Sequence, residues 1–315
     1  MKKILYRILY PLSFILLAFF YFTFESDISS PSTMQMLLYI RLPRIVLAVL
    51  TGAGLAMSGA VMQTLFKNPL ADPYMLGISG GALFGAMLSK LIAGGNIAVL
   101  VCMSFLFAYF SFFLSLFLSK IVKGDKRFTL IMSGLILNIL FSSLVIVLSM
   151  MMKADSKDLF YLLMGSMNII IIKKYIYLYI ILGILLIFAF VITIVKSKEL
   201  DLMAFGDEVA FSSGVDAKKT FDMMMIVSVF IVSVLVSFTG IIGFIGVLIP
   251  NMARVSGSRK HINLLPHSAF FGAFAMLLSD FIAKNLFLFE MPVGVVTSII
   301  GIPFLFIVLK RRSDD

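Results

Sequence analysis

Residues 41–85 read RLPRIVLAVLTGAGLAMSGAVMQTLFKNPLADPYMLGISGGALFG, and this stretch says more about the fold than any other part of the chain. An apolar run follows two arginines, is interrupted by NPLADP at 68–73, and then resumes. Small residues recur every four positions in two rows: Gly52, Ala56 and Ala60, and Gly77, Gly81 and Gly85. In a bilayer, small residues at this spacing let helix backbones approach closely. Taken alone, the rows indicate helix packing and no particular activity.

The composition is that of a membrane protein. Hydrophobic residues make up 61% and charged residues 13% of the chain, with a mean hydropathy of +1.09; soluble domains are about half apolar and a quarter charged. Apolar runs of about 20 residues, enough to cross a bilayer, recur throughout. We therefore expect residues 1–315 to form one all-α membrane domain, a polytopic bundle of about ten transmembrane helices. A single cysteine, Cys102, excludes an internal disulfide.

The apolar runs predict ten spans. They are 4–24, 43–66, 74–92, 96–119, 128–152, 174–196, 221–239, 241–255, 264–286 and 292–309. The basic residues before the first run resemble the start of a signal peptide, but the run is long and no small-residue cleavage site follows, which favours a retained span. Most of the 26 basic residues fall in segments on one side of the membrane, which predicts that both termini are cytoplasmic.

Two segments lie outside the predicted spans. Residues 154–168, ADSKDLFYLLMGSMN, have apolar positions at helical spacing but are too short to span. They form either a short external helix, interfacial or re-entrant, or a plain amphipathic loop. Residues 199–222 form the longest polar stretch on the cytoplasmic side. Within it, Gly206 and Gly214 are expected to punctuate two short helices, and Asp207 and Glu208 fall in the first turn of the second, where negative charge is favourable.

Three further stretches complete an ordered set of motifs. They are GIIGFIGVLIPNMARV at 240–255, LLPHSAFFGAFAMLLSDFIAK at 264–284 and EMPVGVVTSIIGIPFLFIVLKRR at 290–312. From about residue 41 to 312 the chain resembles the FecCD family, the permeases of ATP-binding-cassette importers for ferric siderophores, haem and cobalamin. The resemblance implies the type II importer fold in the cytoplasmic membrane. It also implies a second permease copy or a sister permease, two cytoplasmic ATPase subunits and an extracytoplasmic binding protein as partners, with no nucleic acid. A ferric siderophore is the expected cargo, and haem or cobalamin is the alternative.

The resemblance also assigns residues to roles. It makes 199–222 a coupling segment that docks into the ATPase, with contacts expected from Gly206, Asp207, Glu208, Ala210 and Gly214. Phe211 and Ser213 depart from the family pattern, in which a basic residue and a leucine are common at these positions. The segment 154–168 corresponds to the external helix that caps the translocation path.

The resemblance further implies that basic residues at the external ends of spans meet glutamates on the binding protein. These docking charges are Arg41, Arg44 and Lys284; the alternative is that they only anchor the spans by snorkelling. Four residues are candidates for lining the pathway or for packing helices together: Asn138, Gly165, Pro292 and Gly294.

Ionisable residues inside the spans are few. Asp280 would cost about 2.5–3.5 kcal/mol at the bilayer centre, so it should face protein or water. Asp280 therefore has either a structural role or a role in a proton relay. His261 and His267 have no Cys or carboxylate at ligand spacing, so no metal site is expected.

The chain lacks the sequence features of an enzyme. No Gly-Lys pair occurs, so the phosphate loop G-x-x-x-x-G-K-[ST] is absent, and no cofactor is expected. We therefore expect a transport subunit that takes energy from a separate ATPase. The alternative is an ion-coupled secondary carrier. Such carriers usually bury several ionisable residues near the midplane, and here Asp280 is nearly the only candidate.

Overall fold

The computed structural model describes residues 37–94, 96–152, 161–167, 176–286 and 290–313, together with residues 16, 18, 21 and 23. Every element of this part of the chain is helical. The long helices are α3 (Leu42–Leu65), α4 (Ile78–Ala93), α5 (Ile97–Ile121), α6 (Lys126–Met151), α8 (Ile176–Val195), α11 (Ala217–Thr239), α12 (Ile245–Val255), α13 (His261–Asn285) and α14 (Val293–Ser313). Shorter ones are η1 (Leu37–Arg41), η2 (Pro73–Leu76), α9 (Ser197–Phe205) and α10 (Asp207–Ser212).

These helices confirm the all-α bundle and match the second to tenth predicted spans. Six helices of the described residues are long and apolar enough to cross a membrane by themselves. The eighth predicted span, 241–255, is shorter than expected because α12 begins only at Ile245, and its 11 residues cannot cross a bilayer alone. The first predicted span, 4–24, lies almost wholly outside the described residues.

The NPLADP stretch breaks the chain as predicted. α3 ends at Leu65, and the Asp72 side chain accepts a hydrogen bond from the Tyr74 backbone N–H, which starts the short helix η2. Gly77 then adopts φ +89° between η2 and α4. The predicted row of Gly77, Gly81 and Gly85 faces α5. Gly81 and Gly85 each pack against a carbonyl oxygen of α5, and Gly77, which stands at the N-cap of α4 and not within the helix, meets Ser111 of α5.

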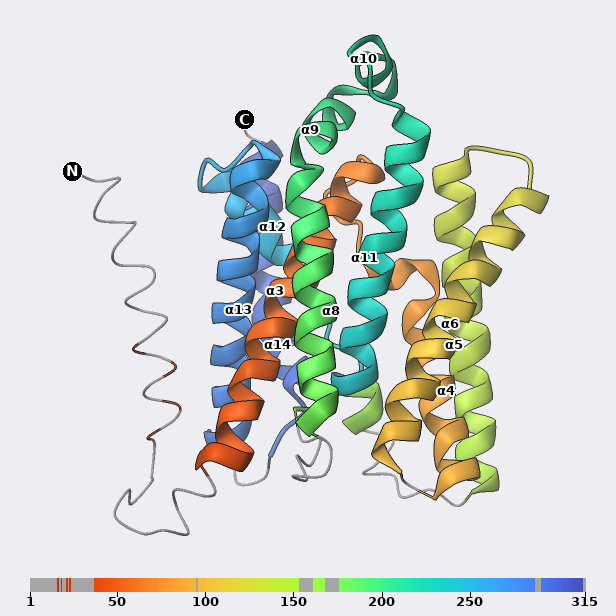
Figure 1. The fold of residues 1–315 in the computed structure, drawn as a ribbon, viewed down its shortest axis with the longest axis vertical. Helices are drawn as coiled ribbons and strands as arrows, with labels where there is room; N and C mark the ends of the chain where they lie inside the picture. Colours follow the sequence, from red (N-terminus) through yellow and green to blue (C-terminus); the bar gives the residue numbers. More distant parts are fainter. Residues whose placement is uncertain are drawn as a thin grey trace.

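α3 is the central helix of the larger part of the bundle. It contacts α8, α11, α12 and α13 and is buried along most of its length (Figure 1). Gly52 meets Gly272 of α13, and Gly59 meets Gly246 of α12, so closely that a Cβ on Gly52, Gly59 or Gly272 would overlap backbone atoms of the partner helix. This crossing explains the row of small residues in α3, because only small side chains permit it.

α4, α5 and α6 pack together as a second group, which joins the rest of the bundle mainly through α11. The outer faces of α5, α6 and α8 carry exposed large apolar side chains, including Phe117, Ile139 and Phe188, each more than 60% exposed. Such surfaces suit contact with lipid tails or with other apolar helices.

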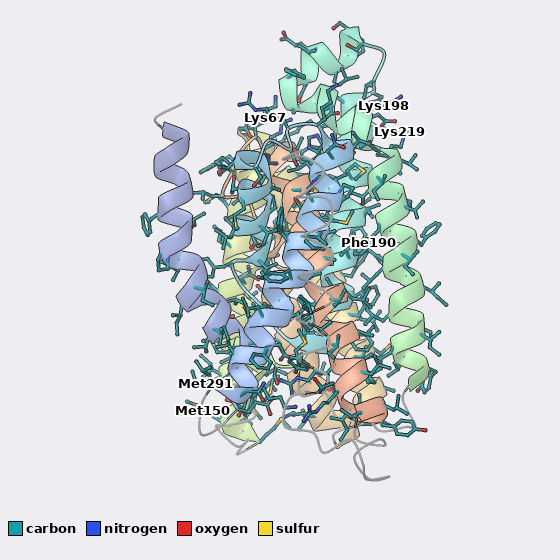
Figure 2. The ribbon with its side chains drawn as sticks, turned by 90° about the vertical axis from the view of Figure 1, so that its left-hand side faces the viewer. Lys67, Met150, Phe190, Lys198, Lys219 and Met291 are labelled. Carbon is teal, nitrogen blue, oxygen red and sulfur yellow. The ribbon has the colours of Figure 1, made fainter. Side chains whose placement is uncertain are left out.

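The two ends of the bundle differ. At one end, which we term the α10 end, the helices α9 and α10 project beyond the long helices (Figure 1). At the opposite end, which we term the Arg41 end, α3 begins and α13 ends (Figure 1). Figure 2 shows Lys67, Lys198 and Lys219 at the α10 end, and Met150 and Met291 at the Arg41 end.

Candidate functional site

The coupling segment has the predicted form at the α10 end. α9 ends at Phe205, Gly206 follows with φ +134° and ψ 156°, and α10 begins at once with Asp207. Gly214, at φ +82°, follows the end of α10. Residues 217–222, however, are the first turns of α11 and not part of the projecting arm. We use the term coupling arm for residues 197–214.

A charge cluster fixes α10 to the bundle. The Arg127 guanidinium, at the start of α6, donates to both carboxylate oxygens of Asp207 at 2.8 and 2.9 Å, and Lys67 Nζ lies 3.3 Å from Asp207 Oδ1. Partial burial opposes ionisation of Asp207, but the hydrogen bonds and charge of Arg127, and then of Lys67, outweigh it and hold the pKa of this carboxyl below its ordinary value. The sequence did not reveal Arg127 or Lys67, which come from distant segments.

The tip of the coupling arm is apolar and exposed. Phe205, the last residue of α9, and Phe211, in α10, are 79% and 78% exposed. Ala210, which also belongs to α10, is in contrast fully buried and is part of the apolar core of the bundle.

α9 is attached to the long helices through two carboxylates. Asp201 Oδ1 accepts hydrogen bonds from the His261 backbone N–H at 2.8 Å and from its Nδ1 at 2.6 Å. His261 Nε2 lies 2.7 Å from Thr64 Oγ1 of α3, and the ring is buried. Glu199 pairs with Lys196 and accepts a hydrogen bond from Thr220 of α11.

His261, the first residue of α13, therefore contacts both α9 and α3. Among the described residues, no group of three or more His, Cys, Asp or Glu side chains is arranged to hold a metal ion. His267 lies near the same end with its Nδ1 beside the Asn263 carbonyl.

The predicted docking charges lie together at the Arg41 end, and one of them has strong internal partners. Arg44 is 5% exposed; its Nε and Nη2 donate to the two oxygens of Asp280 at 2.8 and 2.7 Å, and Nη2 also lies 2.6 Å from Glu290 Oε1. Tyr21 donates a third hydrogen bond to Asp280 at 2.6 Å. Asp280 thus faces protein, as its energetic cost in lipid requires.

The other two basic residues are arranged differently. Lys284 Nζ lies 5.9 Å from the Tyr21 ring centroid and is partly exposed, whereas Arg41 is 8% exposed. Glu290, Tyr21 and Asp280 are neighbours of these cations that the sequence pattern did not bring together.

Of the four pathway or packing candidates, Asn138 has clear packing contacts. Its Oδ1 accepts from the Ser79 hydroxyl and the Gly80 N–H, and its amide donates to the Tyr74 carbonyl at 2.8 Å. Asn138 therefore joins α6 to the start of α4 and to η2. The sequence had left this role open beside a pathway role.

The remaining candidates meet where residues 161–167 approach α14. Gly165 has φ +69°, and its carbonyl accepts a hydrogen bond from the Val293 N–H at 3.1 Å. Gly294 packs directly on the Met164 carbonyl, where a Cβ would overlap it, and Pro292 immediately precedes α14. Residues 161–164 are helical, as expected for part of the external segment; residues 154–160 and 168 lie outside the described residues.

Comparison with known proteins agrees with this architecture. The model of the FecCD transport family matches residues 6–311. A "Probable iron chelatin transport system permease protein" of Helicobacter pylori is 32% identical over 292 residues, which cover 92% of this chain and 86% of that protein. The "Hemin transport system permease protein HmuU" of Yersinia pestis is 32% identical over 290 residues, covering 88% and 84%.

A solved structure extends the agreement to three dimensions. It is described as "an inward-facing conformation of a putative metal-chelate type ABC transporter" and superimposes with a TM-score of 0.85, at 28% identity, over 99% of this chain and 100% of that one. Both the sequence match over nearly the whole length and the shared all-helical fold point to one family. The chain belongs to the FecCD transport family and has the fold of a type II ATP-binding-cassette importer permease.

Proposed function

We propose that this chain is the membrane-spanning subunit of an ATP-driven importer for an iron chelate, with a ferric siderophore as cargo. The observation that carries the proposal is the coupling arm, which projects beyond the bundle with two aromatic side chains exposed. A carrier that works alone has no need of such a surface. A separate ATPase subunit, in contrast, needs an apolar surface to bind, and Phe205 and Phe211 supply that surface.

In this proposal the α10 end is cytoplasmic, and both termini are on that side of the plasma membrane. The surface that meets the ATPase is formed by residues of the coupling arm: Gly206, Asp207, Glu208 and Gly214. Ala210 is buried and packs α10 against the bundle. Two ATPase subunits serve two permease copies, either identical or a sister pair. The exposed apolar faces of α6 and α14, with Ile139 and Phe306 at about 70% exposed, provide the surface for the second copy and for the path between them.

The Arg41 end is then extracytoplasmic and receives a cargo-loaded binding protein. Arg41 and Lys284 supply positive charge for its glutamates, and Arg44 contributes through the charge cluster that it shares with Asp280 and Glu290. Residues 154–168 and the start of α14, near Pro292 and Gly294, form the outer entrance.

Haem and cobalamin are the alternative cargoes, since relatives at 32% and 34% identity are named for hemin transport and for vitamin B12 import. The deciding experiment is uptake of a radiolabelled ferric siderophore, haem and cobalamin by a strain lacking this chain, with and without the gene restored. Restored siderophore uptake supports the proposed cargo. Restoration of only haem or cobalamin uptake replaces the cargo and leaves the importer standing.

A second arm of the experiment addresses the energy source. Inactivating the partner ATPase should abolish uptake in the restored strain. Uptake that persists without ATP hydrolysis, and that collapses with the proton gradient, would instead establish the secondary carrier. The described residues give that alternative little support, because Asp280 is held in an ion pair with Arg44.

A further inference from the structure

We infer that α3 and α13 move as one rigid body, and that the contact between Asp201 and His261 is the joint through which the coupling arm moves them. The inference deepens the proposed function and rests on it. Asp201 and His261 are positioning residues in this scheme, because neither is expected to touch ATP or cargo.

Three fastenings join α3 to α13 along their length. At the Arg41 end, Arg44 binds Asp280 through two hydrogen bonds. In the middle, Gly52 and Gly272 bring the two backbones into direct contact. At the α10 end, Thr64 Oγ1 lies 2.7 Å from His261 Nε2.

The fastenings make sliding or rotation of one helix against the other costly. From residue 44 to residue 64, α3 rises about 30 Å, which is the hydrocarbon thickness of a bilayer. A large relative displacement of the two helices would break a buried ion pair at one end and the Thr64–His261 contact at the other. A force applied at the α10 end is therefore passed to the Arg41 end by the pair as a unit.

The joint is an unusual helix start. Lys260, the residue before α13, gives no side-chain hydrogen bond to the first turn of that helix. Asp201 of α9 provides it instead, since its Oδ1 accepts the His261 backbone N–H. A carboxylate at this position satisfies an otherwise unpaired donor and interacts favourably with the helix dipole. The second hydrogen bond, to His261 Nδ1, fixes the ring that contacts α3.

The other hydrogen bonds and ion pairs of the coupling arm lead mainly to other helices. Glu199 holds the start of α9 to Lys196 and to α11, and Asp207 holds α10 to Arg127 of α6 and to Lys67, which follows α3. α9 also packs on α3 and α13, and within the described part of the chain Asp201–His261 is the hydrogen-bonded contact of the arm whose partner residue in α13 also contacts α3. Movement of α9 by the ATPase therefore acts on the pair at this point.

The test uses the full complex in vesicles: this permease, its ATPase and its binding protein, with a radiolabelled ferric siderophore as cargo. The measured quantity is cargo transported per ATP hydrolysed. Asp201→Ala should leave complex assembly and basal ATP hydrolysis intact and lower this ratio about fivefold or more, the lower end of ordinary coupling free energies. Asp201→Asn, which keeps an oxygen acceptor for both N–H groups, should recover most of it.

The matched control is Asn96→Ala. Asn96 caps the start of α5 through the Ala98 and Val99 N–H groups, so this variant removes a helix cap without touching the coupling arm. It should leave the ratio unchanged. A double variant, Asp201→Ala with His261→Ala, should lose no more than the first alone, because both changes open the same joint.

Three outcomes overturn the inference: an unchanged ratio in Asp201→Ala, an equal fall in Asn96→Ala, or additive losses in the double variant. If Asp201→Ala fails to assemble, Thr64→Val takes its place, since it keeps the cap and removes only the α3 contact. An unchanged ratio in that variant overturns the part of the inference in which α3 moves with α13 through His261. Absence of ATP-dependent uptake in the unaltered complex is a different result, because it removes the proposed function itself.

Discussion

Arg44 and Asp280 form a two-pronged ion pair between α3 and α13, although 236 residues separate them in the chain. Asp280 is fully buried and Arg44 nearly so. The pair explains how a carboxylate is tolerated inside an apolar helix, since an ionised group in such surroundings requires a partner of opposite charge. It also means that the guanidinium assigned to docking is already engaged within the subunit.

The first prediction concerns this pair. Asp280→Ala leaves the Arg44 guanidinium without its main buried partner, and breaking a buried pair in this way costs about 3–5 kcal/mol. Glu290 remains beside Arg44, which places the expected loss at the lower end of that range. The thermal unfolding midpoint in detergent should fall clearly. The apolar double variant Arg44→Met with Asp280→Leu should regain much of the loss; a double variant less stable than the single one would contradict this account.

A second prediction separates two of the proposed docking charges, Arg44 and Lys284. Glu290 competes with an incoming carboxylate for Arg44, so Glu290→Gln should tighten docking of the binding protein, by up to about fivefold at low salt. Charge reversal at the partly exposed Lys284 should weaken docking, more at low salt than at high salt. Binding of the loaded binding protein to the permease in nanodiscs, over a series of salt concentrations, measures both. Equal affinity in all variants would show that docking does not use this cluster.

A third prediction concerns Gly206. No atom lies within 4 Å of the position its Cβ would take, so there is room for a side chain. The backbone, at φ +134° and ψ 156°, is nevertheless in a region that is essentially restricted to glycine, and occupying it costs other residues about 1–3 kcal/mol. Gly206→Ala should therefore lower transport per ATP about as much as a bulky replacement does, with normal membrane insertion. If only bulky residues have an effect, volume and not backbone conformation decides.

The fourth prediction tests the apolar tip of the coupling arm. Phe211 is 78% exposed, so Phe211→Ser should change stability by no more than about 0.5 kcal/mol. Copurification of the ATPase should decrease sharply if the ring anchors the partner. Phe188→Ser is the matched control, because it removes an exposed phenylalanine from the long helix α8 instead. An equal loss of ATPase with both variants would argue against a specific contact.

The fifth prediction gives the pH dependence of the arm's attachment. The pKa of Asp207 is lowered in the folded protein, so its ion pairs contribute stability that is fully present above the ordinary value of 3.8 and is lost only as pH falls through the lower folded value. Hydrogen exchange of residues 204–214 should therefore show no loosening from this group between about pH 8 and pH 5. Arg127→Ala should raise exchange in the same peptides throughout that range, and unchanged exchange would show that the bridge contributes little.

The sequence was sufficient for the helical architecture because apolar length and small-residue spacing are local signals. Gly206 and Gly214 likewise marked the ends of two short helices correctly, since their conformational freedom acts where they stand. Gly77 continues the row of Gly81 and Gly85 toward α5 but stands before the helix, because the cap formed by Asp72 starts a separate short helix first.

The side-chain clusters could not be predicted from the sequence, because their members lie far apart in the chain and leave no local signal. Asp280 could be predicted to need a partner, but nothing in its own neighbourhood indicates Arg44, Glu290 or Tyr21. His261 looked like an isolated histidine near a loop because Asp201 lies 60 residues away and Thr64 lies 197 away. Such contacts depend on how the helices are arranged, which local patterns leave open.

The Arg44–Asp280 pair also constrains the order in which the chain is completed during synthesis. Arg44 enters the membrane early, and its carboxylate partner is made only after most of the remaining chain. Until α13 is made, Arg44 lacks the Asp280 carboxylate that its guanidinium binds in the folded chain. A nascent or truncated chain that stops before residue 280 should therefore hold α3 less tightly. The position of one acidic residue thus makes the packing of α3 depend on the completion of α13.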